Sequence, residues 1–158
     1  MTAPDDFVAR FPELFGVAYR ASYPIVGSRE DAEDCAQEAL ARLLARIRQV
    51  PSAAAVPWVA RVSTNLAIDR WRKLERARVR QPPAVTPTPL DVRRGDLVRA
   101  LRALPARQRE AVVLRHLLDL SERDTATALG CTTGTVKSAT SRGLDRLREL
   151  LGPEWALD

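Results

Sequence analysis

Hydroxyl and basic side chains gather at the start of the last helical segment of the chain, with a spacing that favours contact with DNA. The residues on this outward face are Thr133, Thr135, Lys137, Ser138, Ser141 and Arg142. Hydroxyls and backbone N–H groups at a helix N-terminus bind phosphates, and Lys and Arg side chains can reach guanine edges. An ordinary helical hairpin with a solvated basic face would show the same residue types, so the spacing favours DNA binding without excluding that hairpin.

A helix-turn-helix pattern positions this face. Ser121 and Asp124 can cap a short helix, and Gly130 fits the left-handed conformation that ends it. The longer helix that follows starts near Thr132 or Thr133 and stops at Gly152-Pro153. The second helix of such a motif can enter the major groove of DNA.

A basic stretch from Trp58 to Arg80 carries a second set of side chains with chemistry of its own. Seven basic residues outweigh two acids there, and Asn65 and Trp71 lie among them. Aromatic, amide and arginine side chains beside a loop are what the capture of unstacked bases requires. A basic helix is equally often a solvated face, so the chemistry alone leaves both interpretations open.

An acidic segment stands out in a chain whose net charge is +5. Five acids and one basic residue, Arg29, lie between Ser28 and Glu38. Such a face would repel DNA, so it meets either solvent or a basic protein partner. On composition alone, solvent is the simpler expectation.

Apolar periodicity predicts helices along the whole chain and no strand. The expected helices cover residues 7–22, 28–48, 57–74, 90–104, 105–117, 121–129 and 132–151. Phe11 and Leu90 are expected on the buried faces of their helices. Repeated prolines between Pro82 and Pro89 predict a semi-rigid, solvated linker.

The expected fold class is therefore all-α, with two small helical domains joined by a Pro-rich linker. The predicted boundaries are 1–80 for the first domain, 81–90 for the linker and 91–158 for the second domain. A domain of roughly 70 residues can still bury a core.

Isolated metal-ligand residues predict that the chain holds no metal. Cys35 and Cys131 are far apart, His116 is the only histidine, and zinc sites usually need clustered ligands. Asp5 and Asp6 interrupt the N-terminus, which therefore does not have the pattern of a signal peptide. No apolar run approaches the ~18 residues of a membrane span, so a cytoplasmic protein is expected.

Three segments of the chain resemble one known family. Residues Asp31–Glu38 look like the "AED-x-x-Q-E" segment of sigma region 2 in the extracytoplasmic-function group of sigma-70 factors. Residues Trp58–Arg72 are similar to the "W-[LV]-x-x-[IV]-x-x-N-x-x-x-D-x-x-R" helix that follows in that family. The residues that match sigma region 4 are Leu104-Pro105, Arg109, Leu120-Ser121, Ala126, Leu129-Gly130 and Gly134–Ser138. The matches occur in order over nearly the whole chain.

The resemblance implies a sigma factor that binds core RNA polymerase, directs it to specific promoters and assists DNA melting. It implies no catalytic residue, cofactor or metal. The residues that would dock on the clamp helices of the polymerase β′ subunit are Asp31, Glu33, Asp34, Gln37 and Glu38. Those that would act at the −10 element are Trp58, Arg61, Asn65, Asp69 and Arg72, with the loop Val50–Val56 accepting a flipped base. Those that would read the −35 element are Thr133, Thr135, Lys137, Ser138, Ser141 and Arg142.

The resemblance also implies that the linker threads the polymerase near the RNA path and that region 4 touches the β flap. It leaves open whether an anti-sigma protein holds the chain. Two positions depart from the family pattern. Thr125 stands where an aliphatic residue is usual, which predicts softer packing of the helix-turn-helix, and Cys35 stands where Leu is usual, which a small buried hydrophobe accommodates.

Two other kinds of protein compete with this interpretation. A freestanding regulator could use the helix-turn-helix on duplex DNA and the N-terminal domain for sensing or dimerisation, but it leaves the acidic segment and Asn65 unexplained. An enzyme acting on nucleic acid would need clustered carboxylates or an acid/base pair in a pocket. The acids between Ser28 and Glu38 are instead expected on a solvent-facing helix.

Overall fold

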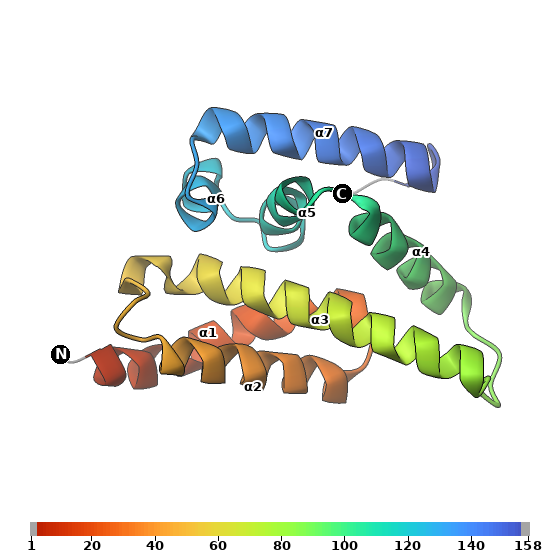
Figure 1. Ribbon diagram of the computed structural model, residues 1–158, viewed down its shortest axis with the longest axis horizontal. Coiled ribbons are helices and arrows are strands. Elements are labelled where there is room, and N and C mark those ends of the chain that lie inside the picture. The colour runs from red at the N-terminus through yellow and green to blue at the C-terminus, as the bar shows by residue number, and fades with distance from the viewer. Residues whose placement is uncertain (1–2, 156–158) are drawn as a thin grey trace.

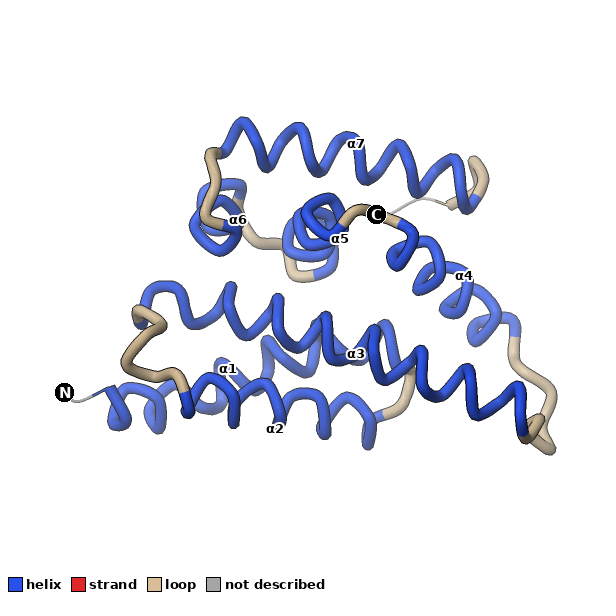
Figure 2. The backbone as a smooth tube through the Cα atoms, in the orientation of Figure 1, coloured by secondary structure: helices blue, strands red, loops and turns tan. Residues whose placement is uncertain are grey.

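The computed structural model describes residues 3–155, and the chain over that range forms helices and no strand (Figure 2). The expected all-α fold is confirmed. Residues 1–2, at the start of the first predicted domain, and residues 156–158, at the end of the second, lie outside the described residues.

The first three helices form one bundle. They are α1 (Ala3–Val26), α2 (Arg29–Ala45) and α3 (Ala55–Arg80), and a single 3-10 turn, η1 (Ser52–Ala54), leads into α3. In Figure 1, α2 and α3 run side by side, and α1 packs against both. Leu14, Leu43 and Val59 lie at the centre of one buried cluster of this bundle.

Helix α1 is longer than the periodicity predicts. Asp5 and Asp6 occupy its first turn, where acidic side chains stabilise a helix N-terminus, so the helix begins before Phe7. The prediction for Phe11 is wrong because its side chain is 43% exposed. It lies at the edge of the buried stripe and stacks on Phe15 instead.

The second half of the chain forms another small helical unit. Its elements are α4 (Pro89–Ala103), α5 (Ala106–Val112), a π-helical turn η2 (Val113–Leu117), α6 (Glu122–Leu129) and α7 (Thr133–Leu151). Leu101, Val112 and Leu147 belong to its buried core. Leu90 is 66% exposed, contrary to the prediction, because it lies in the first turn of α4 beside the exposed linker.

A capping box at the end of the linker begins helix α4. Thr88 accepts a hydrogen bond from the Asp91 backbone N–H at 3.2 Å, and the Asp91 carboxylate accepts one from the Thr88 N–H at 3.0 Å. This reciprocal capping box satisfies two backbone donors, and Pro89 occupies a first-turn position that needs no donor.

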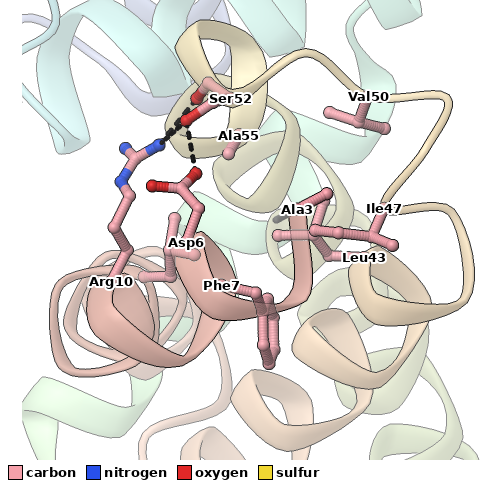
Figure 3. A pocket seen from close by; sticks show the side chains of 10 residues that line it. Ala3, Asp6, Phe7, Arg10, Leu43, Ile47, Val50, Ser52 and Ala55 are labelled. Atoms are coloured by element: carbon pink, nitrogen blue, oxygen red, sulfur yellow. Dashed lines mark hydrogen bonds between the residues drawn. The ribbon is translucent and has the colours of Figure 1, made fainter. Parts of the chain in front are cut away.

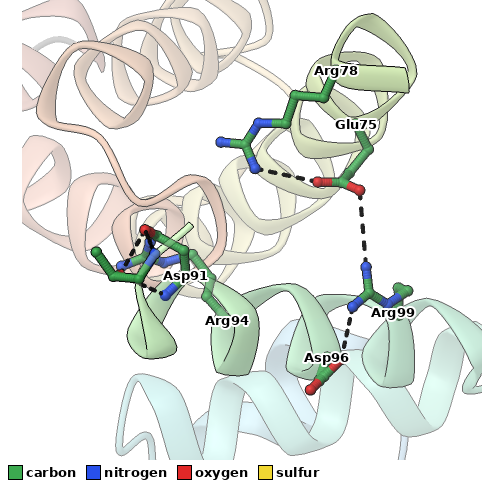
Figure 4. Close-up of polar contacts among 7 residues, drawn as sticks. Glu75, Arg78, Asp91, Arg94, Asp96 and Arg99 are labelled. Atoms are coloured by element: carbon green, nitrogen blue, oxygen red, sulfur yellow. Dashed lines mark hydrogen bonds and ion pairs between the residues drawn. The ribbon is translucent and has the colours of Figure 1, made fainter. Parts of the chain in front are cut away.

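Helix α4 fastens the two halves together. Val98 is fully buried among first-bundle residues such as Ile68 and Trp71. The guanidinium of its neighbour Arg99 lies 3.9 Å from the Glu75 carboxylate (Figure 4). It also lies over the Trp71 ring, 5.9 Å from the ring centroid. The first helix of the second half therefore shares the core of the first.

A buried apolar cluster, here called the seam, joins the remaining elements of the two halves. Its members come from α1 and α3 on one side, and from α5, η2 and the helix-turn-helix on the other. They include Val17, Val56 and Ala60 from the first half and Leu114, Leu118, Leu129 and Cys131 from the second. The two units thus pack against each other as well as through the linker.

Both cysteines are free, and Cys35 is buried while Cys131 is half-buried. Burial raises the pKa of the Cys35 thiol, which keeps it a neutral packing group. Within the described range there is no group of three or more His, Cys, Asp or Glu side chains that could hold a metal ion. None of the helices between residues 3 and 155 is both long and apolar enough to cross a membrane.

Candidate nucleic-acid interface

The helix-turn-helix forms from the capping residues that the sequence indicates. Ser121 caps α6 by accepting a hydrogen bond from the Asp124 N–H at 3.0 Å. Gly130 ends α6 in the left-handed conformation, with φ of 62°. Thr132 then caps α7 by accepting from the Thr135 N–H at 3.1 Å. Each boundary of the motif is therefore fixed by a local hydrogen bond or a glycine.

Helix α7 separates an exposed polar face from a buried apolar one. Val136, Ala139 and Leu147 are buried. The six predicted −35 residues, all of them exposed, are Thr133, Thr135, Lys137, Ser138, Ser141 and Arg142. In Figure 1, α7 lies on the far side of α5 and α6 from the first bundle, which leaves room for a ligand along it.

A close helix crossing holds α7 in place. A Cβ atom on Gly143 would lie 2.6 Å from the Val112 side chain and 3.2 Å from the Gln108 carbonyl oxygen. Only glycine permits α5 and α7 to approach so closely there. Sequence reasoning missed Gly143, since a single glycine within a helical pattern does not reveal which helix it contacts.

Cations flank the exposed face of α7. A cavity of about 280 Å³ lies beside it and is lined by Arg115, Lys137 and Arg148 together with one acid, Glu122. The Lys137 ammonium pairs with that acid at 3.6 Å, and the Lys137 side chain is 65% exposed while that of Glu122 is 38% exposed. Such an exposed pair contributes little stability, so the lysine remains available to a phosphate or a base.

Helix α3 brings the five predicted −10 residues onto one stripe. Spacings of three and four residues place them on the same helical face. Asp69 and Arg72 are exposed, while Trp58, Arg61 and Asn65 are half-buried. At about 100° per residue, Asn65 lies roughly opposite Val56, which belongs to the seam. The stripe is therefore not on the face that packs against the second half.

The acidic segment forms the start of α2 and is anchored at one end. Ser28 caps the helix, and the Asp31 carboxylate accepts hydrogen bonds from Ser28 Oγ at 2.7 Å and from Arg70 Nε at 2.5 Å. Partial burial acts to raise the pKa of Asp31, but these hydrogen bonds outweigh it and leave that pKa below its ordinary value. Asp31 therefore holds α2 against α3.

The other predicted docking residues of α2 face outward. Asp34, Gln37 and Glu38 are exposed, and Glu33 is half-buried. Arg70 also reaches Asp34, at 3.2 Å, across a pair of exposed side chains. Sequence reasoning counted Arg70 only as part of a basic stretch and missed its contact with the acidic segment, because the two lie far apart in the sequence.

Thr125 is fully buried, and its hydroxyl has no hydrogen-bond partner. The residue lies in α6 within the helix-turn-helix. A buried hydroxyl without a partner costs free energy relative to an aliphatic group of the same shape. The softer packing of the helix-turn-helix stays a prediction, and this hydroxyl supports it.

Comparison with known proteins matches both halves of the chain to parts of one family. Residues 7–77 match the family model described as Sigma-70 region 2, and residues 94–147 match Sigma-70, region 4. The RNA polymerase sigma-E factor of Streptomyces coelicolor is 38% identical over 141 residues, which cover 84% of this chain and 78% of that protein.

One further relative and one solved structure also resemble this chain. The ECF RNA polymerase sigma factor SigE of Mycolicibacterium smegmatis is 35% identical over 84% of this chain, and the match spans 56% of that longer protein. The solved structure of the sigma factor RpoE in complex with the anti-sigma factor NepR, from Bartonella quintana, is 25% identical and has a TM-score of 0.57, with 95% of this chain and 99% of that chain covered. The order of the two regions, their helices and these similarities show that the chain belongs to the extracytoplasmic-function group of the sigma-70 family.

Proposed function

We propose that this chain binds core RNA polymerase, directs it to specific promoters and assists DNA melting, and that it has no active site of its own. The observation that carries the proposal is the pair of polar faces, on α3 and on α7, that lie within the two matched family regions. One chain with two such faces can contact two separated promoter elements.

The polymerase-docking role falls to the start of α2. Its outward carboxylates, Glu33, Asp34 and Glu38, and the amide of Gln37 suit the basic clamp helices of the β′ subunit. Asp31 would contribute indirectly, since Arg70 and Ser28 already engage its carboxylate. The proposed docking module covers residues 1–80.

The −10 role falls to the α3 stripe and the loop that precedes it. The stripe combines an aromatic ring, an amide and two guanidinium groups, which suit unstacked bases and the adjacent phosphates. Unstacking a base costs a few kcal/mol, and stacking on protein returns about 1–3 kcal/mol per base. The polymerase must therefore supply much of the free energy of melting.

The −35 role falls to the outward face of α7, in a module covering residues 91–158. Arg142 and Lys137 can reach guanine edges, and the hydroxyls near Thr133 can bind phosphate. The predicted linker, residues 81–90, of which residues 81–88 lie between α3 and α4, would thread the polymerase near the RNA path. The second module would also touch the β flap. We place the protein in the cytoplasm, where this polymerase acts.

An anti-sigma protein is a further candidate partner. The similar Bartonella quintana sigma factor was solved in complex with the anti-sigma factor NepR, and its match extends over 95% of this chain.

Transcription in vitro with core polymerase and a library of promoter sequences tests the proposal. We expect transcripts only when both the chain and core polymerase are present, with defined sequence preferences at both promoter elements. A chain that fails to bind core polymerase, yet binds intact duplex DNA selectively by itself, would instead be a freestanding regulator.

A further inference from the structure

The loop between α2 and α3, residues 46–54, lies over a cavity. The cavity has a volume of about 360 Å³ and opens between α1, the end of α2 and the loop (Figure 3). Phe7, Leu14, Leu43, Ile47 and Val50 provide apolar walls. Ile47 and Val50 also pack against the apolar core of the first bundle. The void nevertheless forfeits the dispersion contacts that filled space would supply, so this packing holds the loop less firmly than a filled core would.

Three hydrogen bonds tie the loop to α1 across this cavity. Ser52 Oγ donates to Asp6 Oδ2 at 2.6 Å. Arg10 Nη1 donates to the Ser52 carbonyl oxygen at 2.7 Å and to Ser52 Oγ at 2.9 Å (Figure 3). These three residues, Asp6, Arg10 and Ser52, are called the clamp below.

The clamp is ordered on the α1 side. Arg10 Nε pairs with the Glu13 carboxylate at 3.0 Å, and the Arg10 side chain is only 24% exposed. The guanidinium is thus held on one edge by its own helix and offers the other edge to Ser52. A planar group with a fixed fork of donors orients its acceptor better than a flexible ammonium does.

The loop's backbone hydrogen bonds do not perform the same task. Val50 N–H donates to the Arg46 carbonyl at 3.1 Å, and Ala54 N–H donates to the Pro51 carbonyl at 2.8 Å. Both bonds lie within the loop itself, so they set its local shape. Besides the apolar packing of Ile47 and Val50, the clamp supplies the polar contacts that set the position of the loop relative to α1.

We infer that Asp6 and Arg10 are positioning residues for −10 recognition, acting through Ser52. The inference rests on the proposed function, in which the loop accepts a flipped base. In this arrangement α1 sets how far the loop stands from the cavity, and the loop position sets the fit of the base. Binding and selectivity depend on such positions to within fractions of an ångström.

The test uses the full chain with core polymerase and promoters randomised over the −10 element, with the −35 element held constant. Arg10→Ala removes two of the three hydrogen bonds of the clamp. Arg20→Ala is the matched control, because Arg20 is exposed on the same helix and its loss changes the charge equally. Arg10→Lys retains a cationic donor without the fork.

We expect Arg10→Ala to weaken discrimination among −10 bases by about two- to five-fold, the effect of losing a modest polar tie. The Arg20→Ala profile should match the wild type, and Arg10→Lys should recover part of the preference. Binding to core polymerase and the preference at the −35 element should stay unchanged, because α2 and α7 do not contribute to the clamp.

A double-mutant cycle adds an independent readout. Asp6→Ala and Ser52→Ala should each reduce −10 discrimination, and the double variant should be little worse than either single one, since both remove the same contact. Fully additive effects would show that the two residues act separately and would overturn the inference.

The remaining outcomes separate this inference from the proposed function. A −10 profile of Arg10→Ala identical to that of the wild type, or an equal loss on all −10 sequences together with weaker core binding, overturns the inference alone. A wild-type chain without core-dependent transcription or without any −10 preference overturns the proposed function, and the inference with it.

Discussion

Among single residues, the side chains on the two polar faces differ in how far the fold already engages them. Arg142 on α7 is exposed at a position where a bidentate contact to a guanine is possible. Asp31 on α2 is engaged by Ser28 and Arg70, whereas Asp34 beside it is half exposed. Exposed residues are therefore the better tests of binding, and engaged residues are the better tests of stability.

Arg142→Ala should weaken promoter use through the −35 sequence, by about 1–3 kcal/mol if the guanidinium makes a bidentate base contact. Transcription from promoters with native and scrambled −35 elements measures the effect. Arg146→Ala is the control, because Arg146 lies on α7 and pairs with Glu149 at 2.8 Å. An equal loss on both promoter types would contradict the assigned role.

Asp34→Arg should abolish co-purification with core polymerase, because a like charge at a charged interface costs several kcal/mol. The fold should persist, since the exposed pair with Arg70 contributes about 1 kcal/mol or less. Asp145→Arg, an equal charge change at an exposed residue of α7, should retain binding. Undiminished binding by Asp34→Arg would refute the docking assignment.

At the scale of whole elements, local sequence signals predicted where the helices begin and end, but not which helices pack against one another. The caps at Ser121 and Thr132 and the stop at Gly130 use only neighbouring backbone groups, so sequence spacing suffices to find them. Val98 in the core of the first bundle depends on a long-range approach that no local pattern encodes. The same holds for the clamp, whose hydrogen bonds join residues 42 and 46 positions apart.

The packing of α6 offers a stabilising substitution. Thr125→Val keeps the side-chain shape and removes a buried hydroxyl that has no partner, so the free energy of unfolding should rise by about 1 kcal/mol. Thr127→Val is the matched control in the same helix, because Thr127 is exposed and its hydroxyl donates to the Arg123 carbonyl at 3.1 Å. Denaturant unfolding of both variants measures the difference. A loss of stability in Thr125→Val would show that the hydroxyl is satisfied in solution.

The contact between α2 and α3 should depend on pH. The folded-state pKa of Asp31 lies below its ordinary value, so the ionised carboxylate adds stability above about pH 4 that is lost as the pH falls through the folded-state pKa. Asp31→Asn should therefore cost about 1 kcal/mol at pH 7 and less near pH 3, where the ionised carboxylate contributes less. Unfolding curves at both pH values measure the difference, and an equal cost at both would contradict the ionic role.

For the molecule as a whole, the seam and the packing of α4 on the first bundle hold the two halves in a compact form. A compact chain of this length has a radius of gyration of about 15 Å, whereas promoter elements about 25 base pairs apart lie about 85 Å apart along the duplex. The compact form cannot span both elements. The seam must open when the chain acts at a promoter, and the polymerase must supply the free energy of opening.

Ala60→Arg should open the seam, because Ala60 is fully buried there. Leu118→Arg should do the same from the opposite side. The radius of gyration from small-angle scattering should increase while the helical content stays constant, and the apparent Kd for core polymerase should fall, since more of the chain is already competent to bind. Ala77→Arg, at an exposed position of α3, should behave as the wild type. A compact profile in both seam variants would contradict this role.

The eight residues between α3 and α4, Gln81–Thr88, also limit what the open form can do. Fully extended at ~3.1 Å per residue, this segment spans about 25 Å. Each base pair inserted between the promoter elements separates them by about 3.4 Å and rotates one about 35° around the duplex axis relative to the other. A tether this short and this rich in proline can accommodate few changes in that distance and rotation. We therefore expect transcription to depend on spacer length, and promoters whose two elements match but are separated by the wrong number of base pairs to be inactive.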